Sequence, residues 1–341
     1  MLLPFLHKVA EHENLSAHEA REAMLAILSG EVSTAQIAAF LIALRMKGET
    51  AEELLGFARA MRDKSHRVEV EGPLLDTCGT GGDGASTFNI STIAGFVVAG
   101  AGVRVAKHGN RSTTIASRCG SADILEALGI AVALTPEQAA QSIRENGIGF
   151  LFAPLMHPAM KYAHPARLEL KMRTIFNLLG PLTNPAGASR QLIGAPSEHA
   201  AGLMAQALAG LGPERAFVVH GSDGLDEITT TGYTIAFEVV GDVVRKHTWV
   251  PADFGVGKAQ AEDLKGGDSR INCGITCALL KGERGPRRDI VLVNAAAALV
   301  AADHAADLQT GVRVAAESID SGAAWSKVES LRRFTGNINP A

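Results

Sequence analysis

Residues 74–84 have the sequence LLDTCGTGGDG, in which an apolar run passes directly into a glycine-rich loop. The run from Leu74 to Cys78 has the length and apolar character of a short buried strand. A predicted helix, Ser91 to Gly100, begins a few residues after the loop. A strand, a glycine loop and a helix in this order are typical of an α/β protein, in which the loop lies at the end of the strand.

Strands and helices continue to alternate after this unit. The predicted strands are VRVA (103–106), AVAL (131–134), IGFLF (148–152) and AFVVHG (216–221), and the predicted helices are Ser121 to Leu128, a segment with a T-x-x-Q capping box at Thr135, and an alanine-rich tail from Ile290. Residues 228–250 predict a hairpin that turns at Gly241-Asp242. This alternation implies right-handed crossovers and a mostly parallel central sheet flanked by helices.

The first 66 residues predict helices only. Three segments begin at Ser16, Ser33 and Thr50, and apolar residues then recur at helical spacing. Gly30 and Gly48 lie where C-terminal caps belong. Short helices of this kind must bury their apolar faces, either on the rest of the chain or on a second copy of it.

Residues 154–187 interrupt the alternation with several prolines and the sequence FNLLGPLTNPAG, which predicts a crossing between two domains. The expected fold class is α/β, with a small all-helical domain and a larger α/β domain. We expect residues 1–70 to form the helical domain, joined by helices from about 165–185. Residues 71–164 and 186–341 are expected to form the α/β domain.

Composition narrows the classes of function. The 341 residues contain 32 Lys and Arg against 36 Asp and Glu, a formal charge of −4, whereas proteins that bind nucleic acid usually have a basic excess. No apolar run approaches the ~18–20 residues needed to cross a bilayer, and the N-terminus lacks the pattern of a signal peptide. The four cysteines are scattered, without a C-x-x-C pair. We therefore expect a cytoplasmic enzyme that binds neither nucleic acid nor membrane.

The glycine loop, residues 79–84, formally matches the G-x-G-x-x-G fingerprint of dinucleotide-binding proteins. That fingerprint requires an acidic residue about 20 positions later for the ribose hydroxyl. Residues 107–112 are instead KHGNRS, which offer cations and hydrogen-bond donors. Together with the loop and the helix start at residues 89–92, they predict a phosphate-binding crevice at two neighbouring strand ends.

Several motifs together resemble the anthranilate phosphoribosyltransferase family. They are GTGGD (79–83), TFNIST (87–92), KHGNRS (107–112), GSADILEALG (120–129), HPAMK (157–161), RTIFNLLGPLTNP (173–185) and GLDEIT (224–229). The helical start LSGEVSTAQIAAFLIALRMKGET (28–50) also matches, so the resemblance covers essentially the whole chain. GTGGD and KHGN alone are shared with pyrimidine nucleoside phosphorylases, and it is the combination of motifs that is specific.

The resemblance implies transfer of the phosphoribosyl group of phosphoribosyl pyrophosphate (PRPP) to the amine of anthranilate, a step of tryptophan synthesis, with the α/β domain as the phosphoribosyl-binding domain. By the family pattern, the residues that bind PRPP are Gly79, Gly82, Asp83, Thr87, Asn89, Ile90, Ser91, Thr92, Lys107, His108, Gly109, Asn110, Arg111, Ser112, Ser117 and Ser121. Those that bind anthranilate are Gly79, Asn110 and Arg167, and those that bind the implied cofactor Mg²⁺ are Ser91, Asp226 and Glu227. We also expect a homodimer formed through the helical domain, and association with an anthranilate synthase component stays open.

The chemistry agrees with these residue types. Departure of pyrophosphate from an anomeric carbon leaves negative charge on the leaving group and a cationic sugar, as in glycosidic cleavage. The protein's task is then mostly electrostatic, and the adjacent carboxylates of Asp226 and Glu227 could share Mg²⁺ with the phosphates. An aromatic amine is nucleophilic enough to attack a cationic sugar, so no dedicated acid or base is predicted.

One loop departs from the family pattern. The segment between Ser112 and Cys119 is two residues longer than usual, so we align residues 107–112 from one side and 117–121 from the other. We predict that Ser112 and Ser117 reach phosphate, while residues 113–116 bulge outward.

Two other functions remain open from the sequence. A pyrimidine nucleoside phosphorylase would use free phosphate without Mg²⁺, although those enzymes are longer and lack the GLDE pair as a metal site. A non-catalytic relative that binds nucleic acid is disfavoured by the charge balance and by the small number of aromatic residues.

Overall fold

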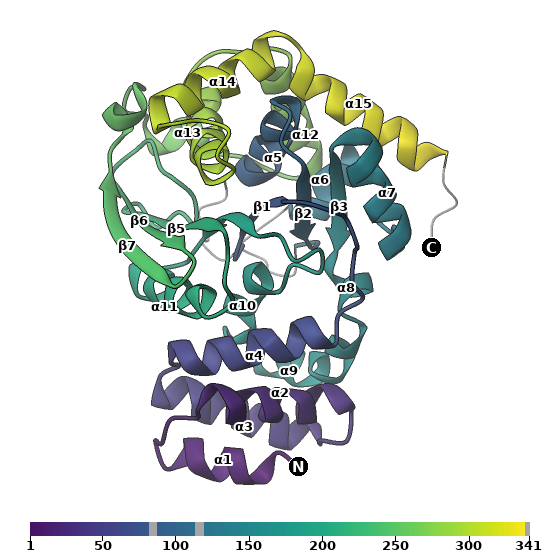
Figure 1. The fold of residues 1–341 in the computed structure, drawn as a ribbon, viewed down its shortest axis with the longest axis vertical. Coiled ribbons are helices and arrows are strands. Elements are labelled where there is room, and N and C mark those ends of the chain that lie inside the picture. Colours follow the sequence, from purple (N-terminus) through teal and green to yellow (C-terminus); the bar gives the residue numbers. More distant parts are fainter. Residues whose placement is uncertain (82–86, 113–118, 338–341) are drawn as a thin grey trace.

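A seven-stranded sheet lies at the centre of the larger part of the molecule (Figure 1). The computed structural model describes residues 1–81, 87–112 and 119–337. The strands are β1 (Leu75–Gly79), β2 (Val105–Gly109), β3 (Ile148–Phe152), β4 (Arg190–Gly194), β5 (Arg215–Gly221), β6 (Thr234–Val240) and β7 (Val243–Trp249). Their order is β3-β2-β1-β4-β5-β6-β7, with β1 to β5 parallel and β6 and β7 antiparallel. The predicted mostly parallel sheet is confirmed.

The connection from β3 back to β4 determines where a ligand can bind. The chain runs outward from β1 through β2 to β3 and then returns to β4 on the other side of β1. The strand order therefore reverses between β1 and β4. In open parallel sheets, ligands bind outside the carboxyl ends of the strands at such a switch point.

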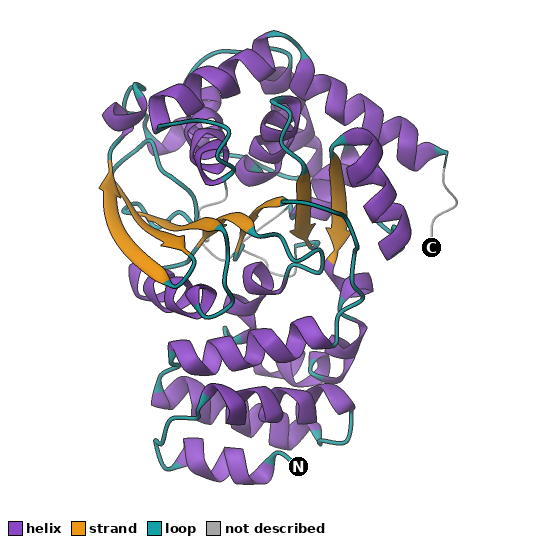
Figure 2. Cartoon of the chain, viewed as in Figure 1, coloured by secondary structure: helices purple, strands orange, loops and turns teal. Residues whose placement is uncertain are grey.

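Helices cover both faces of the sheet (Figure 2). One layer contains α5 (Ile90–Gly100), α6 (Ser121–Ala127), α12 (Ser269–Leu280), α13 (Pro286–Ala301), α14 (Leu308–Asp320) and α15 (Ala323–Gly336), and the other contains α7 (Pro136–Asn146) and α11 (Glu198–Ala209). The alanine-rich sequence of α13 lets it pack closely, and its residues from Ile290 to Ala301 are all buried. No helix in the described ranges is both long and apolar enough to span a membrane.

The N-terminal segment forms a separate stack of helices, at the bottom of Figure 1. They are α1 (Leu3–Ala10), α2 (Ala17–Ser29), α3 (Thr34–Lys47) and α4 (Ala51–Asp63). The predicted caps form, because the side chains of Ser16, Ser33 and Thr50 each accept the backbone N–H three residues ahead. The predicted fold class, a helical part beside an α/β part, is confirmed.

The proline-rich segment connects the two parts. It contains α8 (Ala153–Met156), a 3₁₀ helix (Pro158–Tyr162), α9 (His164–Leu170), α10 (Phe176–Leu179) and a second 3₁₀ helix (Gly180–Thr183). The first 3₁₀ helix packs against α2 and α9 packs against α3, while the second 3₁₀ helix contacts α4, β1 and β2. These contacts support the proposed division of the chain, whose boundaries stay a prediction. Two further 3₁₀ helices, Pro251–Phe254 and Ala261–Leu264, lie after the β6–β7 hairpin.

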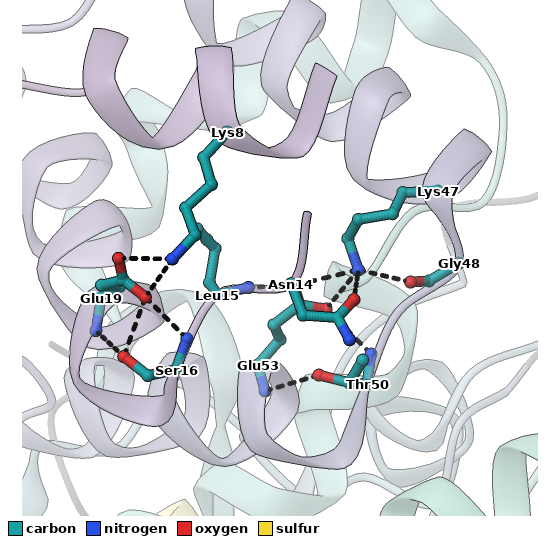
Figure 3. Close-up of polar contacts among 9 residues, drawn as sticks. All are labelled: Lys8, Asn14, Leu15, Ser16, Glu19, Lys47, Gly48, Thr50 and Glu53. Atoms are coloured by element: carbon teal, nitrogen blue, oxygen red, sulfur yellow. Dashed lines mark hydrogen bonds and ion pairs between the residues drawn. The ribbon is translucent and has the colours of Figure 1, made fainter. Parts of the chain in front are cut away.

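A buried ion pair joins three helices of the N-terminal stack (Figure 3). The Lys47 and Glu53 side chains are 2% and 0% exposed, and 3.0 Å separates Lys47 Nζ from a Glu53 carboxylate oxygen. The Glu53 carboxylate also accepts the backbone N–H groups of Leu15 and Thr50. The pair therefore fixes the start of α2 and the start of α4 against the end of α3.

The predicted strand at residues 131–134 is wrong. Ile130, Val132 and Leu134 are buried in alternation, as in a strand, but the Ala131 N–H donates to the Thr335 hydroxyl on α15 and not to a neighbouring strand. The sequence analysis also missed β4 and α1. The sequence of β4, RQLIG, begins with two polar residues, and α1 is only eight residues long.

Candidate active site

The glycine loop after β1 wraps around the carboxylate of Asp226. Asp226 Oδ2 accepts the Gly81 N–H at 2.7 Å and the Thr80 hydroxyl at 3.1 Å. A Cβ atom at Gly79 would lie 3.0 Å from this oxygen, and one at Gly194, at the end of β4, would lie 1.7 Å from the Asp226 carbonyl oxygen. Glycine at these two strand ends therefore allows the loop after β5 to reach the switch point.

The second carboxylate of the GLDE motif lies at the start of α5. Glu227 Oε1 accepts the Ser91 N–H at 3.1 Å. The N-cap residue Asn89 does not cap the helix with its side chain, because its amide bridges the Cys119 carbonyl and the Asn272 side chain. The Ser91 N–H therefore donates to Glu227, and the N–H groups of Ile90 and Thr92 donate to the Phe88 and Asn89 carbonyls. What the start of α5 offers an anion is the positive end of the helix dipole.

The two carboxylates fit Mg²⁺ better than a transition metal. Within residues 1–81, 87–112 and 119–337, no group of three or more His, Cys, Asp or Glu side chains could hold a metal ion on its own. Mg²⁺ is usually held by one or two carboxylates together with substrate phosphates. Asp226 and Glu227 reach the glycine loop and the start of α5 from consecutive positions in the chain, so together with a phosphate ligand they match that requirement.

The end of β2 places the KHGN residues beside this site. The Lys107 side chain is buried, and its ammonium donates to the Thr77 carbonyl of β1. A Cβ atom at Gly109 would lie 2.1 Å from the Ser121 hydroxyl, so glycine is required for α6 to approach. The Asn110 carbonyl accepts both the Ala122 N–H and the Ser121 hydroxyl. The end of β2 therefore holds Lys107 against β1 and Asn110 against the start of α6.

The next two residues contact the start of α6. The Arg111 guanidinium forms an ion pair with Glu126 and lies 4.8 Å from the centre of the Phe152 ring. The Ser112 N–H donates to the Asp123 carboxylate at 2.9 Å. The Arg111 side chain is thus paired on the surface of α6, and its contact with PRPP stays a prediction.

Two neutral histidines lie behind this loop. Burial lowers the pKa of His108 to about 4 and that of His157 to about 3. Their ring centroids are 5.1 Å apart, and His108 Nδ1 is 3.2 Å from the Gly180 carbonyl oxygen. If that nitrogen carries the proton, the other nitrogen of His108 is a lone-pair acceptor. Neither imidazole is charged at neutral pH.

Arg167 lies on α9, in the segment that connects the two parts of the molecule. Its guanidinium lies 5.3 Å from the centre of the Phe176 ring, and burial lowers its pKa. It makes no ion pair with Glu169 or with any other acid among the described residues. Phe176 opens α10, and Gly180 directly after α10 contacts His108. Arg167 is therefore separated from the end of β2 by a single short helix.

A cavity of about 250 Å³ opens beside the glycine loop. It is lined by residues from the two strand ends, from the end of α3 and the turn after it, and from the connecting segment: Thr80, Pro196, Arg45, Glu49, Arg173, Thr174, Asn177 and Leu178. It lies where the helical part, the connecting segment and the sheet meet. Arg167 is not among the described residues that line it.

Comparison with known proteins agrees with this architecture. Residues 71–325 match the model for the glycosyl transferase family, a/b domain, and residues 3–65 match the model for the glycosyl transferase family, helical bundle domain. The anthranilate phosphoribosyltransferase of Solibacter usitatus is 64% identical over 339 residues, which cover 98% of this chain and 99% of that protein. The chain belongs to the anthranilate phosphoribosyltransferase family.

Solved structures of the anthranilate phosphoribosyltransferase family share the fold. The enzyme from Thermus thermophilus is 44% identical and aligns with a TM-score of 0.92 over 97% of this chain and 99% of that one. The Saccharomyces cerevisiae enzyme, solved in complex with PRPP and Mg, is 28% identical with a TM-score of 0.90, over 99% of this chain and 98% of that one. The family prediction made from the motifs is confirmed.

Most of the site residues predicted from the sequence lie at the ends of β1, β2 and β5. The predicted residues Gly82, Asp83 and Ser117, and the expected bulge at residues 113–116, lie outside the described residues. Thr87 forms an isolated bridge with Lys265, and Ile90 and Thr92 are buried in the first turn of α5.

Sequence reasoning about this site missed four residues that shape it. They are Thr80 and Gly194 around Asp226, and Asp76 and Asn184 beside β2. Asp76 had a visible signal, because it is a charged residue inside the apolar run of β1. Gly194 had none, because the strand that it ends was not predicted.

Proposed function

We propose that this chain transfers the phosphoribosyl group of PRPP to the amine of anthranilate, giving N-(5-phosphoribosyl)anthranilate and pyrophosphate, with Mg²⁺ bound at Asp226 and Glu227. The observation that carries the proposal is the pair of carboxylates that reach the glycine loop and the first turn of α5. Family membership over nearly the whole chain supports the activity.

The phosphates would lie at the ends of β1 and β2. The start of α5 supplies the positive end of its helix dipole, and Lys107 supplies an ammonium from β2. Bound Mg²⁺ would neutralise negative charge on the departing pyrophosphate. The protein's own groups are preorganised by the contacts with Asp226 and Glu227, so little reorganisation is needed as that charge develops.

Anthranilate would bind from the side of the connecting segment. Arg167 carries a guanidinium without a carboxylate partner among the described residues, and an aromatic ring beside it. A guanidinium pairs with a carboxylate through two parallel hydrogen bonds, and Asn110 with Gly79 would complete the site near the sugar.

We also propose a homodimer formed through the helical part. Met46 on α3, Leu168 on α9 and Met172 after it are 74%, 59% and 46% exposed, and α3 and α9 pack against each other. Exposed apolar residues gathered on neighbouring helices favour a protein partner. Light scattering during size-exclusion chromatography should give twice the chain mass, and Met46→Glu with Leu168→Glu should give a monomer.

The activity is tested by mixing the protein with PRPP, Mg²⁺ and anthranilate and following the loss of anthranilate fluorescence. Consumption that requires all three components supports the proposal. Phosphorolysis of thymidine or uridine without Mg²⁺, in place of anthranilate consumption, would instead identify a nucleoside phosphorylase.

A further inference from the structure

The strands β1 and β2 pair only at their beginning. Their register contains one pair, Leu75 with Val105, whereas β1 with β4 and β2 with β3 each pair over five residues. In a parallel ladder, the next two bonds would join the Thr77 N–H to the Ala106 carbonyl and the His108 N–H to the Thr77 carbonyl. The sheet therefore opens between β1 and β2 on the way to the site.

Side chains take the place of these backbone partners. The Asp76 carboxylate accepts the His108 N–H at 3.2 Å and also the Thr77 N–H. The Asn184 amide donates to the Ala106 carbonyl at 2.8 Å, and the Lys107 ammonium donates to the Thr77 carbonyl. All four backbone groups that the ladder would have used are thus satisfied. We call Asp76, Lys107 and Asn184 the strand bracket.

The strand bracket is itself connected. Asn184 Nδ2 donates to Asp76 Oδ2 at 2.8 Å, and Asn184 Oδ1 accepts the Ala186 N–H at 2.9 Å. Because side chains alternate along a strand, Asp76 points to the face of the connecting segment and Lys107 to the face of α5. A Cβ atom at Gly95 of α5 would lie 3.6 Å from Lys107 Cδ, which agrees with that direction.

A continued ladder would satisfy the same four backbone groups without burying any charge. Asp76 is 0% exposed, Lys107 4% and Asn184 1%, and burying charges is unfavourable even when they are hydrogen-bonded. Burial raises the pKa of Asp76 to about 6, although Lys107 and the hydrogen bonds from Asn184 and His108 oppose the rise. Replacing the ladder with buried charges is thus an unfavourable way to build a sheet. It occurs where the loop after β1 and the loop after β2 must separate.

We propose that Asp76 and Asn184 are positioning residues of the phosphoribosyl site, which hold β2 apart from β1 and so set the places of Lys107 and of the following loop, residues 108–112. The inference rests on the proposed function and adds two residues to it. In this proposal neither residue touches substrate. Asn184 belongs to the connecting segment, so the bracket also ties the anthranilate side of the site to the phosphate side.

The test compares two buried carboxylates. Asp76→Asn turns one acceptor oxygen into a donor that faces the donors of His108 and Asn184. Glu53→Gln makes the same change in the helical part, where the carboxylate is also 0% exposed and accepts two backbone N–H groups. Both variants should lower the melting temperature. Only Asp76→Asn should raise the Kd for PRPP, measured by calorimetry with Mg²⁺ present, by tenfold or more, while Glu53→Gln changes it less than twofold.

A second variant tests the positioning role if Asp76→Asn does not fold. Asn184→Ala removes the donors to Asp76 and Ala106 and should raise the PRPP Kd at least threefold. Normal PRPP affinity in a folded variant of either residue would overturn the positioning role and leave a stability role alone. Wild-type protein that neither binds PRPP nor consumes anthranilate would overturn the proposed function instead, so the two failures are distinguishable.

Discussion

Lys47 and Lys107 are buried lysines near buried carboxylates, and they differ in their hydrogen-bond partners. Lys47 donates to Asn14, Gly48 and Glu53 in the helical part (Figure 3), and these partners account for all three N–H groups of its ammonium. Among the residues that the structure describes, Lys107 donates only to the carbonyl and hydroxyl of Thr77. Within the described parts of the chain, no ion pair joins it to Asp76.

The difference shows that burial and charge do not by themselves identify a functional residue. Both ammoniums are buried and both lie near a carboxylate. Lys47 has no donor left for a ligand, whereas the bonds of Lys107 to the described residues go to Thr77 alone and use at most two of its three N–H groups. A buried polar group that is fully partnered holds the fold together. One that keeps bonding capacity beside a crevice is placed to meet a substrate.

The largest effect is expected at the strand ends, from Asp226→Asn combined with Glu227→Gln. These changes keep an oxygen acceptor for the Gly81 and Ser91 N–H groups but remove two charges from the metal site. We expect turnover at limiting Mg²⁺ to fall by about 10²–10³ or more, equivalent to roughly 3–4 kcal/mol of transition-state stabilisation. The assay is anthranilate fluorescence across a Mg²⁺ titration.

Glu238→Gln serves as the control for this pair. It neutralises a carboxylate that is 12% exposed and paired with Arg215, away from the glycine loop, and should leave turnover close to normal. Near-normal turnover of a folded double variant at low Mg²⁺ would show that Asp226 and Glu227 do not bind the metal.

The next effect tests the two lysines directly. Lys107→Met should lower kcat/KM for PRPP by about 10–100-fold, the value of one hydrogen bond to a charged group, with a smaller effect on stability. Lys47→Met should do the reverse, because it leaves Glu53 buried without a counter-charge, which costs about 3–5 kcal/mol of folding free energy. Urea denaturation gives the free energy of unfolding of each variant, and initial rates give kcat/KM for PRPP of each. Equal losses of activity in the two variants would mean that Lys107 and Lys47 do not differ in function.

Arg167 should behave like Lys107 and not like Lys47, since its guanidinium lies over the Phe176 ring and forms no ion pair with a carboxylate in the described part of the chain. Arg167→Ala should raise the KM for anthranilate about 10–100-fold, as expected for the loss of a charged hydrogen-bonding pair, and leave the KM for PRPP nearly unchanged. Equal weakening for both substrates would mean that Arg167 holds the two parts of the molecule together.

The sequence was sufficient for those features that depend on local pattern. The caps at Ser16, Ser33 and Thr50, the strand before the glycine loop and the hairpin turn at residues 241–242 each follow from residues that are adjacent in the chain. Local pattern failed at residues 131–134, where alternating burial arises from packing against helices and not from strand pairing.

The parts of the site that were missed depend on long-range contacts. Asp76 meets His108 across 32 positions and Asn184 across 108, so the neighbouring sequence shows a charged residue inside an apolar run but not the partners that complete the strand bracket. In the same way, Gly194 is required only because the loop that carries Asp226 approaches it from β5. Motif resemblance predicted residues that bind substrate but did not predict Asp76 and Asn184, which would hold the strand ends apart.

The smallest effect concerns the pH dependence of stability at Asp76. Burial raises its pKa to about 6 in the folded protein, above the ~3.9 of an unfolded aspartate. Between about pH 4 and pH 6 the folded state therefore binds more protons than the unfolded state, so this group lowers stability as the pH rises through that window and has its full unfavourable effect above it.

His108 and His157 act in the opposite direction. Their folded pKa values of about 4 and about 3 lie below the ordinary value, so their contribution to stability is lost as the pH falls from about 6.5 towards those values. The free energy of unfolding as a function of pH contains the effects of Asp76 and of the two histidines together. A difference between the wild type and a variant is needed to separate them. We expect the free energy of unfolding of the wild type, minus that of Asp76→Asn, to be larger at pH 4.5 than at pH 7. Urea denaturation at the two pH values measures it. A difference that is the same at both, or larger at pH 7, would mean that Asp76 is stabilised as a carboxylate by the strand bracket and that its burial is not unfavourable.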